Sequence, residues 1–336
     1  MSENNATALP FAPGFSCDLS YSGIFENVKY LLQCAYMVPP AILYARILYV
    51  IWVKNRKIYI QHQFFVIYSM DSVVGLLLLL LDIFITRFYV YIPQFCESSS
   101  KFFLSHPILM DIYYPFLNYL HCCQPLIQIF LTLNRMSSVV WPVDHNKIWR
   151  KNLSFIIIFI LITPFLFIWN TVISPKILIF YFGGFYINYQ KLVPWAGMSL
   201  FLMILRSIAV GITVVSTVIT FWKMTKMRNR LKKSEKTLCF ACAGTSICFF
   251  IPAIFEAFKA LNSFWAKHWM AYLLQPFAWD VLNVGSPLVL IFASNQLRGH
   301  VFGLKCSEKR NSTKSNSIFL TSNSLTTSHR ISNFKK

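Results

Sequence analysis

The sequence predicts an all-α integral membrane protein, a seven-transmembrane helix bundle with its N-terminus outside and its C-terminus in the cytosol. Hydrophobic residues make up 56% of the 336 residues and charged residues only 13%, about half the usual charged share of a soluble domain. Seven stretches are long and apolar enough to cross a bilayer, and basic residues gather in alternate connections between them. A soluble protein of this composition would expose large apolar patches. The composition therefore argues against a soluble enzyme, a disordered chain and a nucleic-acid-binding protein.

The N-terminal segment, residues 1–28, contains acidic residues but no lysine or arginine. It lacks the basic start and short apolar core of a cleavable signal peptide, so we expect the first span to act as the signal anchor and this segment to stay outside. Asn5 begins an Asn-Ala-Thr sequon in the segment, and the sequence predicts glycosylation there.

The central region, residues 29–295, contains the predicted spans. Each has about 20 or more mostly apolar residues, which is the length that a helix needs to cross the hydrocarbon core. The third is long enough to tilt strongly. In chain order the predicted spans cover residues 30–53, 63–86, 107–134, 153–173, 196–222, 237–258 and 269–294.

Lysine and arginine residues set the orientation of the bundle. The connections after odd-numbered spans and the C-terminal tail hold 22 of the 31 basic residues, whereas the opposite side holds 7. Because basic loops stay in the cytosol, these connections are assigned to the inner face. That face then accounts for the whole net charge of +19, which indicates anionic lipid of the inner leaflet as a partner and not nucleic acid.

The C-terminal tail, residues 296–336, is polar, basic and rich in serine and threonine. It has too little apolar content to fold alone, so we expect it to be disordered in the cytosol. At its start the run RGHVFGLKC, residues 298–306, favours a short amphipathic helix on the membrane surface.

Cysteines indicate one disulfide and no metal site. Cys17 and Cys96 are the two cysteines expected on the oxidising outer face, so the sequence predicts a bridge between them. Cys239 and Cys242 form a C-x-x-C pair in the sixth span, but no second pair or histidine cluster accompanies it, and we interpret them as small helix-packing residues. The sequence predicts no cofactor.

Four ionisable residues in the outer half or middle of the spans are the predicted ligand pocket: Asp111, His121, Arg206 and Asp280. Ionisable groups in hydrocarbon usually face a partner or a cavity. Two interpretations of Arg206 stay open: a structural ion pair with Asp280 or another acid, and an anchor for a ligand carboxylate or carbonyl. His121 is either a ligand contact or a hydrogen-bonded packing residue.

A second polar set lies deeper. Asp71 in the second span is placed to share a network with Asn283 and Ser286 in the seventh, just before Pro287. Such a network can hold two alternative helix packings, as a switch requires. Pro252 in the sixth span permits a kink above the basic third inner loop.

The inner end of the third span reads LTLNRMSSVVWPVDHNKIW. This run resembles the hallmark of nematode serpentine receptors of the gamma class, in which an Asn-Arg-Met run precedes a proline and a tryptophan. The matching residues here are Asn134, Arg135, Met136, Pro142 and Trp149. With the order of spans, the resemblance covers about residues 30–300.

The resemblance implies a chemosensory receptor that binds a small molecule and signals through a heterotrimeric G protein, in the plasma or ciliary membrane of sensory neurons. Arg135 occupies the place of the arginine in the Asp-Arg-Tyr motif of better-known seven-helix receptors. The preceding residue is Asn134, which cannot form the ion pair of that motif, so a resting lock there would use hydrogen bonds or another acid. The second outer loop, residues 174–195, has no cysteine, so the disulfide of rhodopsin-like receptors is absent.

Two other function classes fit the sequence less well than a receptor does. A small-molecule transporter or channel would also use intramembrane charges, but no paired halves of similar pattern are visible. An intramembrane enzyme is disfavoured because no H-E-x-x-H, G-x-S-x-G or G-x-G-D pattern occurs in a span. A receptor is the preferred interpretation, and no catalytic residue is assigned.

Overall fold

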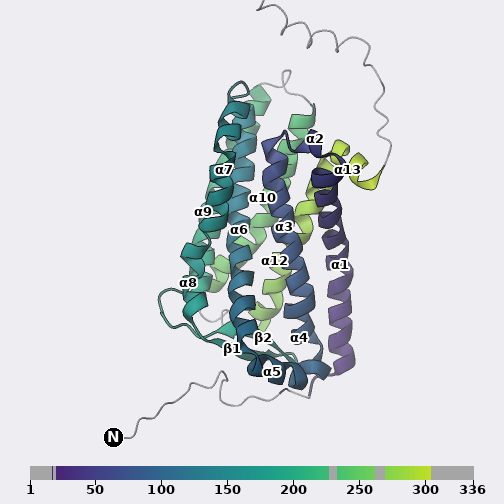
Figure 1. Cartoon of the computed structure of the whole chain (residues 1–336), viewed down its shortest axis with the longest axis vertical. Coiled ribbons are helices and arrows are strands. Elements are labelled where there is room, and N and C mark those ends of the chain that lie inside the picture. The colour runs from purple at the N-terminus through teal and green to yellow at the C-terminus, as the bar shows by residue number, and fades with distance from the viewer. Residues whose placement is uncertain (1–16, 18–19, 227–232, 262–268, 304–336) are drawn as a thin grey trace, which may run out of the picture.

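The computed structural model describes the chain except for residues 1–16, 18–19, 227–232, 262–268 and 304–336. Long helices run side by side along one axis (Figure 1), and a helix covers most of each of the seven predicted spans. The elements are α1 (Gly23–Tyr49), η1 (Val50–Lys54), α2 (Arg56–Tyr59), α3 (Gln63–Leu81), η2 (Asp82–Arg87), α4 (Phe88–Tyr91), η3 (Pro93–Phe95), α5 (Cys96–Ser105), α6 (Pro107–Val140), α7 (His145–Ile162), α8 (Phe165–Ile173), β1 (Lys176–Tyr181), β2 (Gly184–Tyr189), α9 (Met198–Lys226), α10 (Lys233–Leu261), α12 (Trp269–Ala293) and α13 (Asn295–Phe302).

A helix can cross a bilayer only if it is long and apolar enough. Within the described residues, five helical stretches are long and apolar enough to cross a bilayer, namely Gly23–Lys54, Gln63–Tyr91, His145–Ile173, Met198–Lys226 and Pro276–Ala293. In α10 the apolar part, Cys239–Phe255, is shorter than in these five stretches. Helix α6 is more polar because it lies at the centre of the bundle, in contact with α3, α7, α8, α9 and α10, where its side chains face other helices. The fold is therefore a membrane helix bundle.

The first two helical segments differ from their predicted boundaries. Helix α1 begins at Gly23, before the predicted start of the first span at residue 30 and inside the segment 1–28. The second helix does not end at residue 86. It passes through the π-helical turn η2 and continues as α4 to Tyr91. Arg87, which the sequence placed in an outer loop, is consequently inside the helix and 2% exposed.

The second outer connection is a β-hairpin that the sequence did not predict. Strands β1 and β2 pair antiparallel, with Lys176 opposite Tyr189 and Tyr181 opposite Gly184. The turn uses Phe182 and Gly183 at positive φ, as tight hairpins require. A Cβ atom on Gly184 would lie 2.1 Å from the carbonyl oxygen of Tyr89, so only glycine lets β2 lie this close to α4.

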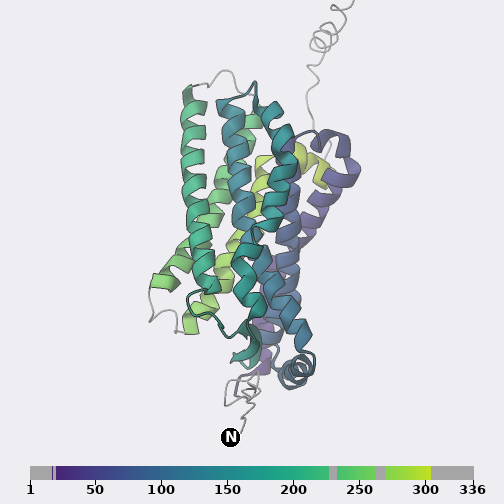
Figure 2. The same cartoon turned by 60° about the vertical axis from the view of Figure 1, so that its left-hand side comes forward.

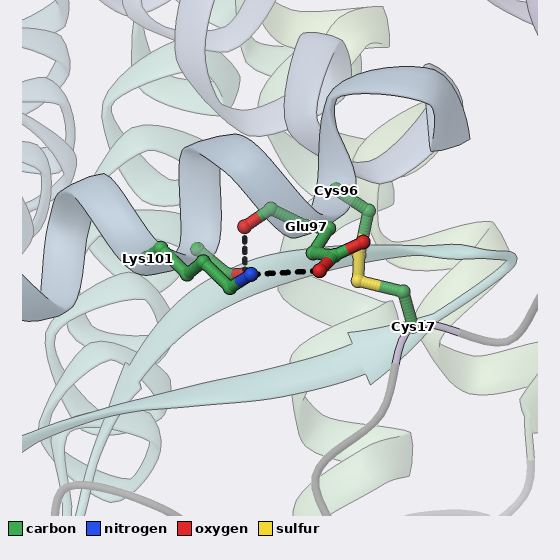
Figure 3. The surroundings of a disulfide bond; sticks show 5 residues. Cys17, Cys96, Glu97 and Lys101 are labelled. Carbon is green, nitrogen blue, oxygen red and sulfur yellow. Dashed lines mark hydrogen bonds and ion pairs between the residues drawn. A yellow bond between two sulfur atoms is a disulfide. The ribbon is translucent and has the colours of Figure 1, made fainter.

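The hairpin and α5 lie together at the end of the bundle opposite α13 (Figures 1 and 2). A separate apolar cluster joins them to the outer end of α6, and it includes Cys96, Phe103, Met110, Leu178, Phe185 and Ile187. Cys17 and Cys96 form a disulfide with their Cα atoms 6.1 Å apart (Figure 3). This is the pair that the sequence singles out, and the bond fixes the N-terminal segment to α5.

The start of the C-terminal tail is helical, and α13 overlaps the short helix predicted at residues 298–306. The hydroxyl of Ser294 accepts a hydrogen bond from the Leu297 N–H and caps α13, and Gly303 follows the helix at φ 67°. His300 Nδ1 and the Tyr59 hydroxyl are 2.7 Å apart, which holds α13 against α2. The rest of the tail, with most of the serine-rich run, lies outside the described residues.

Replacing both bridge cysteines, Cys17→Ser with Cys96→Ser, is expected to lower the free energy of unfolding by roughly 2–4 kcal/mol, because the bond restricts the unfolded chain. Thermal unfolding of the purified protein without reductant measures the change. Cys34→Ser, which removes a free thiol, is the control and should unfold at nearly the wild-type temperature. Equal unfolding temperatures for the double variant and the wild type would contradict a stabilising bridge.

Candidate functional site

A cavity of about 350 Å³ lies beneath the hairpin, at the end of the bundle opposite α13. This size is within the range of small-molecule sites. Its walls come from η2, α4, α6, β1, β2, α9 and α12. It is lined by Ile85, Thr86, Arg87, Tyr89, Val90, Tyr91, Tyr113, Tyr114, Leu117, Asn118, His121, Tyr181, Phe182, Phe185, Tyr186, Ile187, Asn188, Tyr189, Lys191, Met198, Ser199, Leu202, Pro276 and Trp279.

The walls of the cavity are aromatic, and hydrogen bonds fix their polar tips. The hydroxyls of Thr86 and Tyr113 are 2.8 Å apart, and the Tyr114 hydroxyl donates to Asn188 Oδ1 at 3.1 Å. The Asn118 amide donates to the Tyr114 carbonyl oxygen at 2.8 Å. These bonds hold the rings in place, so the cavity is largely preformed.

The hairpin covers the cavity and is tied to the start of α9. The Tyr189 hydroxyl accepts a hydrogen bond from the Met198 N–H at 2.8 Å. Burial raises the pKa of Tyr189, so its hydroxyl stays protonated at neutral pH. The Asn170 amide donates to the Ala196 carbonyl oxygen at 2.6 Å, which fixes the connection between β2 and α9. The mouth is therefore braced by hydrogen bonds from α8 and α9.

The floor of the cavity is formed by His121 on α6 and Trp279 on α12. Their ring centres are 4.4 Å apart. His121 Nδ1 and Trp279 Nε1 are buried, and neither atom has a hydrogen-bond partner among the described residues. The guanidinium carbon of Arg206, which is not among the lining residues, lies 5.6 Å from the centre of the Trp279 ring.

A buried ion-pair network lies beside the floor and joins three helices. The Arg87 guanidinium donates to Asp280 at 2.6 Å and to Asp82 at 2.8 Å. It also donates to Gln33 at 2.9 Å and to the Tyr36 hydroxyl at 2.8 Å, both on α1. Because Arg87 and Asp280 are 2% and 4% exposed, each charge depends on its partners for stabilisation.

The four residues predicted to form the pocket are separated in the structure. His121 lines the cavity, but Asp280 is bound to Arg87 and Asp111 lies 3.3 Å from Lys176 of the hairpin. Arg206 is 1% exposed and is not among the residues that line the cavity. In this packing only His121 of the four lines the cavity, and a pocket formed by all four stays a prediction.

Sequence reasoning missed Arg87, Trp279 and the tyrosines of the walls. Arg87 was assigned to a loop because its charge ended the apolar run. A signal was available, since Asp82 precedes Arg87 by one π-helical turn and the apolar run FYVYI follows it. The tyrosines carry no such signal, because the sequence does not show which of them the hairpin brings to the cavity.

The predicted switch residues are partly brought together. Ser286 donates to Asp71 Oδ2 at 3.0 Å, which joins α12 to α3 as expected. Asn283 is bound instead to α6, because Gln124 donates to its side-chain oxygen at 2.5 Å. Pro252 and Pro287 lie inside α10 and α12.

At the inner end of α6, Arg135 and Asn134 have different surroundings. The Arg135 guanidinium carbon lies 3.8 Å from the centre of the Phe64 ring, a cation–π distance. Asn134 is fully buried, and both polar atoms of its side chain lack a hydrogen-bond partner among the described residues. A hydrogen-bonded lock through Asn134 is therefore not formed in this packing.

Two predictions concern parts of the chain outside the described residues. These are the glycosylation of Asn5 and the basic centre of the third inner loop, residues 227–232.

Comparison with known proteins gives concordant matches. The model of the Srg family of chemoreceptors matches residues 30–301. Serpentine receptor class gamma-8 of Caenorhabditis elegans is 63% identical over 96% of this chain and 99% of its own length. Serpentine receptor class gamma-9 of the same organism is 63% identical over 93% of this chain and 94% of its own. Class gamma-2 is 46% identical over 88% of this chain and 91% of its own.

Replacing Arg87 by methionine is expected to destabilise the protein by about 3–5 kcal/mol, because it leaves the Asp280 carboxylate buried without its partner. Adding Asp280→Asn should restore much of the loss. Thermal unfolding in detergent or nanodiscs measures both variants. The matched control is Lys101→Met, which removes an ion pair whose two side chains are 72% and 77% exposed and should change the unfolding temperature little. An Arg87→Met variant as stable as the control would show that the network does not hold the helices together.

Proposed function

The chain belongs to the Srg family of chemoreceptors, and on this premise we propose that it is a membrane receptor that binds a small molecule from outside and signals through a heterotrimeric G protein. The observation that carries the proposal is the aromatic cavity at the outer end of the bundle, whose floor adjoins the buried Arg87 network. A ligand in the cavity contacts the same stretch of α12 that this network holds.

The proposed topology has seven transmembrane helices, an outer segment 1–28, a membrane domain 29–295 and a cytosolic tail 296–336. The first helix begins inside the outer segment, at Gly23, and α13 forms the start of the tail. The distribution of basic residues supports it. The disulfide between Cys17 and Cys96 supports it further, because disulfides persist on the oxidising outer face. The proposed location is the plasma or ciliary membrane of sensory neurons. The basic inner loops face anionic lipid.

Helix α12 is the proposed route of the signal. Trp279 lines the cavity and Asp280, the next residue, is bound by Arg87. One turn further, Asn283 is bound by Gln124 of α6, and Ser286 is bound to Asp71. Polar contacts on consecutive turns make two discrete packings of α12 accessible, so a ligand that displaces Trp279 shifts the population between them.

Arg135 and the adjoining helix ends are the proposed contact for the G protein. His121 and Arg135 are fourteen residues apart on α6, which corresponds to about 21 Å along a helix. Next to Arg135, both polar atoms of the Asn134 side chain lack a hydrogen-bond partner among the described residues, which supports a packing here that changes on activation. Opening of α10, hinged at Pro252, is the proposed movement that exposes Arg135. The alternative function, a small-molecule transporter or channel, has no structural observation in its favour.

Replacing Arg135 by alanine is expected to reduce signalling by about tenfold or more while the receptor still reaches the cell surface. The measurement is a G-protein reporter in transfected cells, read against a panel of small metabolites and normalised to surface labelling. Arg150→Ala, which removes an exposed basic residue at the start of α7, is the matched control and should keep most of the response. Ligand-dependent current or uptake without G-protein activation would contradict the receptor and favour the transporter or channel.

A further inference from the structure

We propose that His121 and Trp279 recognise a neutral hydrogen-bond acceptor, such as the carbonyl oxygen of a ketone, carried on an apolar body of the ligand. This inference rests on the proposed function, because it takes the outer cavity as the ligand site. It adds the chemical class of the ligand and the two residues that select it.

Two polar atoms at the floor of the cavity are available to bond a ligand. Trp279 Nε1 and His121 Nδ1 are both buried, and neither has a partner among the described residues. His121 is 4% exposed. A buried donor without a partner is costly, and buried polar groups in native proteins are rarely left so. A ligand that supplies the missing partner therefore gains the hydrogen bond and removes this cost.

Three polar groups of the walls are already engaged. The Tyr113 hydroxyl is paired with Thr86, the Tyr114 hydroxyl donates to Asn188, and the Asn118 amide donates to a carbonyl oxygen. These groups are engaged within the protein. The walls consequently present mainly ring faces and edges, which suit an apolar or aromatic ligand body.

The Arg87 guanidinium lines the cavity, but its donors are also in use. They go to Asp82, Asp280, Gln33 and Tyr36. An anionic ligand would have to displace Asp280 in order to pair with Arg87, which would leave a buried carboxylate without its partner. The geometry therefore favours a neutral polar group.

The other basic side chain that lines the cavity is Lys191, and it lies at the mouth. It is exposed, and its Nζ would be only 2.9 Å from a Cβ atom placed on Gly197. An anion held by Lys191 would thus be solvated and remote from the floor. No acidic side chain lines the cavity within the described part of the chain, so the site also lacks the counter-charge that a cationic ligand requires.

The chemistry of the two floor groups narrows the choice further. The indole Nε1–H only donates, whereas an imidazole nitrogen donates or accepts according to its tautomer. A carbonyl oxygen with two lone pairs can accept from both. Because both floor atoms are covered in this packing, a ligand reaches them only when Trp279 turns. That movement acts directly on Asp280, the next residue.

The test is direct binding to the purified full chain in nanodiscs, which needs no G protein. The probes are two matched sets: acetophenone, ethylbenzene and benzoate, and cyclohexyl methyl ketone, ethylcyclohexane and cyclohexanecarboxylate. We expect each ketone to bind about tenfold more tightly than its hydrocarbon, the factor that a hydrogen bond to a neutral group contributes.

Three variants identify the atoms involved. Trp279→Phe keeps an aromatic ring but removes the N–H, and His121→Phe removes both ring nitrogens. Each should weaken ketone binding about tenfold and leave hydrocarbon binding unchanged. The matched control is Tyr119→Phe, which removes a hydroxyl of α6 that donates to the Leu161 carbonyl oxygen and does not line the cavity, and it should leave the ketone preference unchanged. Unfolding temperatures without probe show whether each variant is folded, and either floor variant alone suffices for the test.

The inference is overturned by any of three results: no preference for ketones, a ketone preference that survives in a folded floor variant, or preferred binding of the carboxylates that is lost in Lys191→Gln. The two proposals are separable. Ketone binding that depends on Trp279 without any G-protein response would overturn the signalling function and leave this inference standing. A G-protein response to ligands whose binding does not depend on either floor residue would overturn this inference and leave the signalling function standing.

Discussion

The buried guanidinium of Arg87 is the interaction on which the outer half of the bundle depends. It joins Gln33 and Tyr36 on α1, Asp82 on its own helix and Asp280 on α12, so three helices that are distant in sequence are held at fixed positions. In a low-dielectric interior such a charge is stable only while its carboxylate partners remain within hydrogen-bond distance. The position of α12, and with it Trp279 at the cavity floor, therefore follows from this network.

The outer cap depends on a different kind of constraint. The disulfide, α5 and the hairpin pack around one apolar cluster, which closes the cavity from above while α6 and α12 form its floor. The tight approach of Gly184 to the Tyr89 carbonyl places the hairpin against α4, and the Tyr189–Met198 hydrogen bond places it against α9. The cavity thus lies between the cap and α12, an arrangement suited to the proposed transmission of occupancy inward.

Much of the fold was predictable because membrane helices can be recognised in a sequence by their length and apolarity. The helical ranges, the serpentine family and the pair Cys17 and Cys96 all follow from local composition and motif. The candidate site was predictable only in part, because depth along a helix does not give its rotation. The sequence placed Asp280 and Arg206 at similar depths, yet Asp280 pairs with Arg87, whereas Arg206 lies near the Trp279 ring and outside the cavity lining. Arg87 was misplaced in an outer loop, although Asp82 one π-helical turn before it and the apolar run after it indicate that the helix continues.

By itself the sequence determined that the chain is a helical membrane protein of the serpentine chemoreceptor kind. Local composition indicates the helices, and a local motif indicates the family. The tertiary structure alone decided which polar groups meet. The pairing of Arg87 with Asp280, the binding of Asn283 by Gln124 and the two unsatisfied atoms of His121 and Trp279 depend on helix rotation and on the fold of the hairpin. Ion pairs and hydrogen bonds act over a few ångströms, so packing determines which residues form the site.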